Sequence, residues 1–275
     1  MLGLTKTKAQ EATVVTTQDF ITELFCRVDD AMTEVEKHPQ AELYPSEVGT
    51  LALLFAIKGV GNRAFYRFVE RDFKHLFPRL PERTRLFRLF VTHREWAARF
   101  LAEPTVLGVI DAYGIELLHP IREGRTPHQI GRKGLSNHRW IVGGKLCLLL
   151  NKLGLVVGWE CATANVHDTH FQPLVQQFAD EMIVLADEGF HARTGDPKNL
   201  KICERGTWNV RMVVETVLSM LTLVSHFKHV MHRVWRYFEM RLGWTMAAFN
   251  ILAQWHGLEP DNEGVVHLSI AEFSL

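Results

Sequence analysis

Three acidic residues lie in apolar surroundings, where a charge needs a partner. Asp111 and Asp187 follow the apolar runs 106–110 and 182–186, and Glu215 interrupts an apolar segment with helical spacing. An ionised carboxylate in such surroundings is costly unless it is paired, and several converging carboxylates usually share a divalent cation. The three residues therefore predict a metal site with oxygen ligands. On an α/β scaffold, such a site is typical of enzymes that cut and rejoin phosphodiesters.

The segment after residue 104 predicts the elements that would position these acids. Strands are expected at 106–111, 114–118, 145–150 and 155–163, with a hairpin turn at 151–154. There follow a helix at 169–180, a strand at 182–186, a short strand near 201–203, a long helix after Trp208, and helices at about 226–241 and 244–255. Strand hairpins followed by alternating strands and helices predict an α/β domain with a mixed sheet.

The segment before residue 104 predicts only helices. Apolar residues have helical spacing at 18–37, and Ser46 is the expected N-cap of a second helix that ends at Gly59. A third helix is expected at 62–75, and two shorter ones follow it. Residues 1–17 are polar and Thr-rich, which predicts a flexible lead-in.

A mixed sheet would bring the acids to one place. If Asp111 and Asp187 end neighbouring strands, they emerge at the same edge, where open α/β sheets bind ligands. A helix packed across that edge would add Glu215. The alternative is that Asp111 opens a turn, Asp187 caps the next helix, and Glu215 pairs with Arg211 one turn earlier. The order strand, strand and helix favours the shared site.

Composition restricts the class of protein. The chain has 275 residues, 47% hydrophobic content and a formal charge of zero, so it is expected to be globular and has no overall basic signature. Basic residues are concentrated at 58–99, where eleven Lys or Arg stand against four acids. Four separated cysteines indicate a reducing compartment and exclude a zinc ribbon. No apolar run reaches about 18 residues, so a soluble cytoplasmic protein is expected.

The acids lie in blocks that resemble the bacterial insertion-sequence DDE transposases. The blocks are Val109-Ile110-Asp111, Ala186-Asp187-Glu188-Gly189-Phe190, and Arg211 with Glu215, Thr216 and Ser219. Gly144-Lys145-Leu146 and the segment 163–168, which ends in Asp168, are similar to that family's middle strands and the aspartate after them, and Asn250 resembles a C-terminal asparagine of the group. The resemblance covers roughly residues 40–255, and the order and spacing of the blocks are specific.

The resemblance implies an RNase H-like core whose acids hold two Mg²⁺ ions, with Mn²⁺ as a substitute. Asp111 would bridge the ions, and Asp187 and Glu215 would complete one each. The implied partner is double-stranded DNA, as element terminal inverted repeats and as target, and the implied working form is a homodimer with no membrane association. The implied location is the bacterial cytoplasm, at the nucleoid. The expected organisation is a helical DNA-binding region at 18–104, the catalytic core at 105–258 and a C-terminal tail at 259–275.

The chain departs from the family pattern at four positions. Trp208 stands where members often carry Tyr, and Thr222 stands where many have a basic residue, which puts one terminal-phosphate contact in doubt. Cys147 replaces a histidine, and Gly114 replaces a proline. None of these changes removes a predicted metal ligand.

Basic residues in two segments are candidates for contacts with DNA phosphate. Arg63, Arg67 and Arg71 recur every four residues and predict a basic stripe along one helix, although such a stripe is usually a solvated face. Arg211 could contact phosphate or orient Glu215. The other candidates lie between the first and third predicted strands, where a solvated loop is the alternative: Arg122, Arg125, Arg132, Lys133, Arg139 and Lys145.

Two other functions remain open at this stage. An inactive or domesticated relative would bind DNA without cutting it. The pair His167-Asp168 and the spacing His226-x-x-His229-x-x-His232 also resemble zinc ligands or a His-Asp metal phosphohydrolase. Phosphohydrolases of that kind are all helical, and the strand pattern at 106–163 counts against this alternative.

Overall fold

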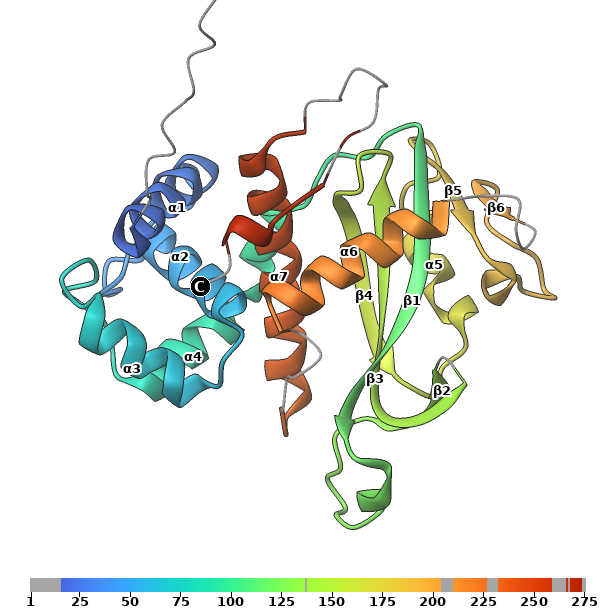
Figure 1. The fold of residues 1–275 in the computed structure, drawn as a ribbon, viewed down its shortest axis with the longest axis horizontal. Coiled ribbons are helices and arrows are strands. Elements are labelled where there is room, and N and C mark those ends of the chain that lie inside the picture. Colours follow the sequence, from blue (N-terminus) through green and yellow to red (C-terminus); the bar gives the residue numbers. More distant parts are fainter. Residues whose placement is uncertain are drawn as a thin grey trace, which may run out of the picture.

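A computed structural model of the chain describes residues 16–136, 138–203, 210–226, 232–258, 266 and 268–273. Figure 1 shows a group of N-terminal helices, a long helix beside it, and a mixed sheet beyond that helix. The expected lead-in lies outside the described residues except for Thr16 and Thr17, which cap and begin the first helix.

The N-terminal region is helical, as expected. Its elements are α1 (Thr17–Ala31), α2 (Pro45–Lys58), α3 (Asn62–Asp72), α4 (Arg83–Thr92) and the 3-10 helix η1 (Arg94–Phe100). The prediction of Ser46 as N-cap was wrong. Tyr44 is the N-cap of α2 and its backbone N–H donates to Glu47 Oε2 at 2.7 Å, while Pro45 occupies the first helical position, where its missing N–H costs nothing.

The sheet has six strands in the described part of the chain: β1 (Leu107–Leu118), β2 (Arg132–Ser136), β3 (Arg139–Asn151), β4 (Val156–Thr163), β5 (Ile183–Ala186) and β6 (Leu200–Ile202). β3 pairs antiparallel with β1 on one side and with β2 and β4 on the other. β5 is parallel to β1, and β6 is parallel to β5. This mixed sheet with flanking helices is the predicted RNase H-like α/β architecture.

Two details of the sheet differ from the prediction. The expected strands 106–111 and 114–118 form one strand, because Tyr113 and Gly114 pair with Leu146 and Lys145 without a break. A side chain at Gly114 would collide with Ser136, since an added Cβ would stand 2.4 Å from its hydroxyl oxygen. The strand β2 was not predicted. The turn at 151–154 is confirmed, with Gly154 at a φ of 78°.

The helices after the first strands also differ in length. The expected helix at 169–180 is shorter, and consists of η3 (Asp168–Phe171) and α5 (Gln172–Gln176). The long helix α6 (Val210–Val224) is present. One continuous helix, α7 (Trp235–His256), replaces the two expected at the C-terminal end. Its middle turns are buried, and Gly243 allows close packing because an added Cβ would lie 3.0 Å from the Trp159 ring.

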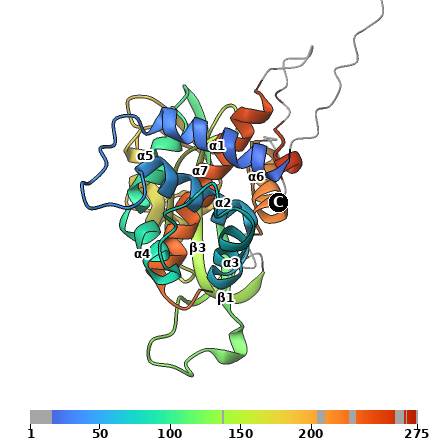
Figure 2. The ribbon, with the colours of Figure 1, turned by 90° about the vertical axis from the view of Figure 1, so that its left-hand side faces the viewer.

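Helix α7 joins the two halves of the molecule. It contacts α2, α4 and η1 on one side and β4 on the other. Figure 2 shows the N-terminal helices lying over it, in the view from their side. Buried residues of α1–α4, β1, β3, β4, α6 and α7 form one continuous hydrophobic cluster, whereas the other face of the sheet has a second cluster around α5, β5 and β6.

Candidate active site

Asp111 and Asp187 stand at the same level of two neighbouring parallel strands. The last paired residues of β1 and β5 are Val109 and Leu185, and each aspartate follows two positions later. Asp111 is half-buried, and its Oδ1 accepts a hydrogen bond from the Ala112 N–H at 2.7 Å. Asp187 is exposed, and its Oδ1 accepts from the Gly189 N–H at 2.9 Å. Asp187 therefore caps the short helix η4 (Glu188–Phe190) as well as ending β5.

The third acid, Glu215, lies on α6. Side chains alternate along β1, with Val109 in the first hydrophobic cluster and Ile110 in the second, which assigns Asp111 to the face of the first cluster. Helix α6 contacts β1, contributes buried residues to the same cluster, and crosses the sheet in Figure 1. Glu215 itself is exposed on this helix.

No metal centre is preformed among the residues that the structure describes. No three His, Cys, Asp or Glu side chains in these residues are placed to hold one metal ion. Asp111 and Glu215 make polar interactions within the protein instead. The donor set of hard carboxylate oxygens fits Mg²⁺ in chemistry. The convergence of all three carboxylates therefore stays a prediction.

A fourth carboxylate, Asp168, lies next to Asp187. A Cβ added to Gly189 would stand 2.9 Å from Asp168 Oδ2 and 3.0 Å from Asp187 Oδ1, so both carboxylates border the same small volume. Asp168 also accepts from Lys145 Nζ at 2.8 Å, and Lys145 donates to the Val166 carbonyl at 2.8 Å. Lys145 is thus committed to a half-buried ion pair, which differs from its expected role as a phosphate contact.

The buried thiol of Cys147 is within the electrostatic influence of both Asp111 and Asp168. Burial raises the pKa of the Cys147 thiol, and the negative charges of Asp111 and Asp168 raise that pKa further. Both carboxylates therefore act on the same buried sulfur of β3. The sequence had marked Asp168 through its resemblance to a family block, but had not placed it beside Asp187.

The candidate stripe on α3 faces solvent. Arg63, Arg67 and Arg71 are all exposed. The Arg71 guanidinium is already held by both oxygens of Asp72, at 2.7 and 2.8 Å, whereas no ion pair is found for Arg63 or Arg67 in the described part of the chain. Arg63 and Arg67 are therefore the stronger candidates for phosphate contacts.

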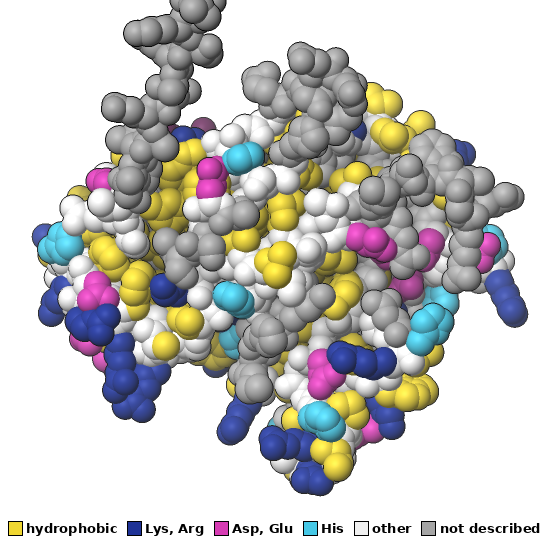
Figure 3. All heavy atoms as spheres, in the orientation of Figure 1, with side chains coloured by type: hydrophobic (Ala, Val, Ile, Leu, Met, Phe, Trp, Pro, Cys, Tyr) yellow, Lys and Arg dark blue, Asp and Glu magenta, His cyan; other side chains and the backbone are white. Residues whose placement is uncertain are grey.

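The second group of cations lies on a projection formed by the end of β1, the segment 119–131 with the short helix η2 (Pro120–Arg122), β2 and the start of β3. The projection extends below the sheet in Figure 1, and Lys and Arg side chains gather on it in Figure 3. Two of its cations form exposed ion pairs, Lys133 with Glu123 at 3.1 Å and Arg139 with Glu116 at 3.3 Å. Arg122, Arg125 and Arg132 are also exposed. The Arg211 side chain lies outside the described residues, as does Trp208.

Apolar side chains are interleaved with the cations of this projection. Trp140 is 58% exposed, and the Lys133 ammonium lies 5.5 Å from the centre of its ring. Ile121 and Leu135 are exposed as well. Basic and aromatic groups on one exposed surface are compatible with binding of a polyanion.

Thr222, which stands where many family members have a basic residue, uses its hydroxyl within α6. Its hydroxyl donates to the Leu218 carbonyl at 2.7 Å, within its own helix. The terminal-phosphate contact that Thr222 puts in doubt stays untested.

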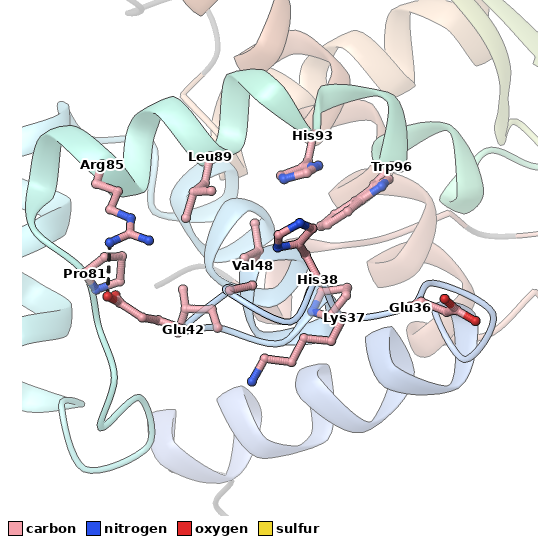
Figure 4. A pocket seen from close by; sticks show the side chains of 13 residues that line it. Glu36, Lys37, His38, Glu42, Val48, Pro81, Arg85, Leu89, His93 and Trp96 are labelled. Carbon is pink, nitrogen blue, oxygen red and sulfur yellow. Dashed lines mark hydrogen bonds and ion pairs between the residues drawn. The ribbon is translucent and has the colours of Figure 1, made fainter.

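A separate pocket in the helical region is too small for an active site of this kind. Figure 4 shows His38, His93 and Trp96 around it, with the Glu42–Arg85 ion pair at its edge. The rings of His93 and Trp96 stack with centroids 3.9 Å apart. The cavity volume is about 100 Å³, which is well below the range typical of ligand sites.

The histidine alternatives receive no support from the described residues. His229 lies outside them, and no zinc-like group of three ligands is found within them. Burial lowers the pKa of His232 to about 4, with a further contribution from the Arg241 charge. The mixed sheet also differs from the all-helical fold of His-Asp phosphohydrolases.

None of the helices in the described part of the chain has the length and apolar character that a membrane crossing requires.

A search of curated proteins found no match to the sequence. A family model described as the transposase DDE domain matches residues 103–258, which is more than half of the chain and includes the whole sheet and all three acids. The chain therefore belongs to the transposase DDE domain family.

Proposed function

We propose that this protein is a DNA transposase that cleaves the ends of an insertion sequence and joins them to target DNA. The observation that carries the proposal is the placement of Asp111 and Asp187 at the same level of adjacent parallel strands, in a chain of the transposase DDE domain family. Glu215 on the helix that contacts β1 is the third acid of the proposed centre.

Asp111, Asp187 and Glu215 would hold two Mg²⁺ ions, with Mn²⁺ as a substitute. When bound, the cations would supply activation of a water molecule or a DNA 3′-hydroxyl and stabilisation of the leaving oxygen. Asp111 is the bridging ligand in this proposal, because its strand β1 pairs with β5 and also contacts α6.

DNA would be held by the exposed cations of α3 and of the projection. Phosphate contacts of this type position the duplex without reading its sequence. Recognition of terminal inverted repeats by the helical region, and a homodimer that holds two element ends, are part of the same proposal. The nucleoid of a bacterial cell is the corresponding location.

The test uses isosteric variants of the acids. Asp111→Asn, Asp187→Asn and Glu215→Gln should each abolish Mg²⁺-dependent nicking of element-end DNA while leaving its binding intact. The matched control is Asp180→Asn, an exposed aspartate that precedes the opposite end of β5. Undiminished nicking by Asp187→Asn would refute the proposal.

The two alternative functions give different results in the same assays. Wild-type protein that binds end DNA but nicks it with neither Mg²⁺ nor Mn²⁺ would identify a DNA-binding relative. Hydrolysis of small phosphomonoesters that depends on His167 would identify a phosphohydrolase.

A further inference from the structure

The ion pair of Lys145 and Asp168 lies beside the proposed catalytic acids. The Lys145 side chain is 13% exposed and that of Asp168 27%, with 2.8 Å between Nζ and Oδ1. An exposed ion pair contributes little to stability. The Lys145–Asp168 pair is half-buried, where charges are less screened by water and act more strongly on their neighbours. The Asp168 and Asp187 carboxylates both border the space above Gly189.

We propose that Asp168 is a fourth carboxylate of the cation-binding edge, positioned by Lys145, and that it acts on the same cation as Asp187. This inference rests on the proposed function. Asp168 Oδ1 is occupied by Lys145, while Oδ2 faces the volume that it shares with Asp187 Oδ1. Asp168 Oδ2 is therefore the oxygen that could share a cation with Asp187, whose Oδ1 also accepts from the Gly189 N–H at 2.9 Å.

Lys145 has two effects in this arrangement. Its hydrogen bonds to Asp168 and to the Val166 carbonyl fix the carboxylate in place. Its positive charge also offsets part of the negative charge here, which lowers the repulsion between Asp168 and Asp187 when no cation is bound. Lys145 is therefore a positioning residue rather than a DNA contact.

Because Asp168 and Lys145 carry opposite charges, we expect their single substitutions to have opposite effects on Mn²⁺ affinity. Asp168→Asn keeps the size of the side chain and its acceptor for Lys145, and it should weaken Mn²⁺ binding on the order of tenfold, as for other groups next to metal ligands. Lys145→Gln removes the offsetting charge and should strengthen Mn²⁺ binding. The double variant should return to near the wild-type affinity.

The experiment measures Mn²⁺ affinity of the full chain by isothermal titration calorimetry and Mn²⁺ electron paramagnetic resonance, together with the Mg²⁺ concentration for half-maximal nicking. That concentration should rise for Asp168→Asn and fall for Lys145→Gln. Glu42→Gln is the control, because it neutralises an ion-paired carboxylate in the helical region and should change neither quantity. Thermal unfolding of each variant verifies that the chain is folded.

A purely structural ion pair gives another pattern. Both single variants would then lower the unfolding temperature and shift Mn²⁺ affinity in the same direction or not at all, which would overturn the inference. If wild-type protein binds Mn²⁺ and Asp187→Asn weakens the binding while Asp168→Asn does not, the inference fails and the proposed function stands. If wild-type protein binds no Mn²⁺, both fail.

Discussion

Asn250 and Val156 are 94 positions apart in the sequence, and the side chain of one pairs with the backbone of the other. Val156 N–H donates to Asn250 Oδ1 at 2.8 Å, and Asn250 Nδ2 donates to the Val156 carbonyl at 2.8 Å and to the Phe100 carbonyl at 3.0 Å. Asn250 is fully buried. Its amide thereby attaches α7 to the first residue of β4 and to the end of η1.

Replacing Asn250 by Ala should destabilise the fold by about 2–4 kcal/mol, because a buried N–H would lose its acceptor and the two carbonyls a donor. Urea unfolding followed by circular dichroism measures this change. Asn165→Ala, at an exposed asparagine after β4, is the control and should change the free energy of unfolding by less than about 0.5 kcal/mol. Equal effects of the two substitutions would contradict the role given to Asn250.

His232 should make the protein less stable in mild acid. Its pKa is lowered to about 4 by burial and by the Arg241 charge, and its Nε2 is buried without a hydrogen-bond partner in the described residues. Between about pH 6.5 and pH 4 the unfolded chain takes up a proton on this ring that the folded protein does not, so stability is lost as the pH falls through that window. The maximum contribution is about 3 kcal/mol.

The measurement is the free energy of unfolding in urea at pH 7 and at pH 5. His232→Gln should reduce the difference between the two values, since the variant has no imidazole to protonate. His75→Gln, at an exposed histidine, should leave the difference unchanged. A wild-type pH dependence that survives in His232→Gln would show that other groups cause it.

Gly189→Ala should impair cation binding with little effect on folding. The added methyl would stand 2.9–3.0 Å from the oxygens of Asp168 and Asp187 and would force the two carboxylates apart. Mn²⁺ affinity should fall by roughly tenfold. Gly61→Ala is the matched glycine control, because an added Cβ there meets no atom within 4 Å. Unchanged affinity in Gly189→Ala would mean that no cation binds next to these oxygens.

Arg63→Gln and Arg67→Gln should weaken binding to duplex DNA and make it less dependent on salt. Each lost phosphate contact should lower the slope of log K against log salt by about 0.9. Arg71→Gln should have a smaller effect, because Asp72 already holds that guanidinium. Fluorescence anisotropy over a range of NaCl concentrations measures the slopes, and Arg27→Gln on α1, whose guanidinium pairs with Glu23, is the control. Equal slopes for all four variants would exclude α3 from the DNA interface.

The sequence predicts the sheet better than the helices around it. Apolar runs that end in Asp111 and Asp187 identify the central strands, because a strand buried on both faces has a continuous apolar pattern. Ser46 was misassigned because the Tyr44 backbone, held by Glu47, begins α2 two residues earlier. The break expected near Gly243 is absent because tertiary packing against Trp159 retains the helix.

The candidate site, too, could be predicted from the sequence only in part. Residue types and order predict Asp111, Asp187 and Glu215 as the acids of the site, but spacing along the chain contains no information on how η3 and η4 meet. The proximity of Asp168 to Asp187 depends on a glycine at 189 and on a lysine from β3, neither of which has a periodic signal. Strand β2 was missed because its short segment contains Gly134, which has low strand propensity.

Helix α7 fixes the N-terminal helices relative to the sheet, because it packs against both. Because its buried side chains belong to the same cluster as those of α3 and β1, the arginines of α3 and the acids at the sheet edge cannot change their separation without exposing that cluster to water. If the chain acts as proposed, the distance along DNA between the phosphates bound by α3 and the bond that is cut would be set by the fold itself and not by a hinge.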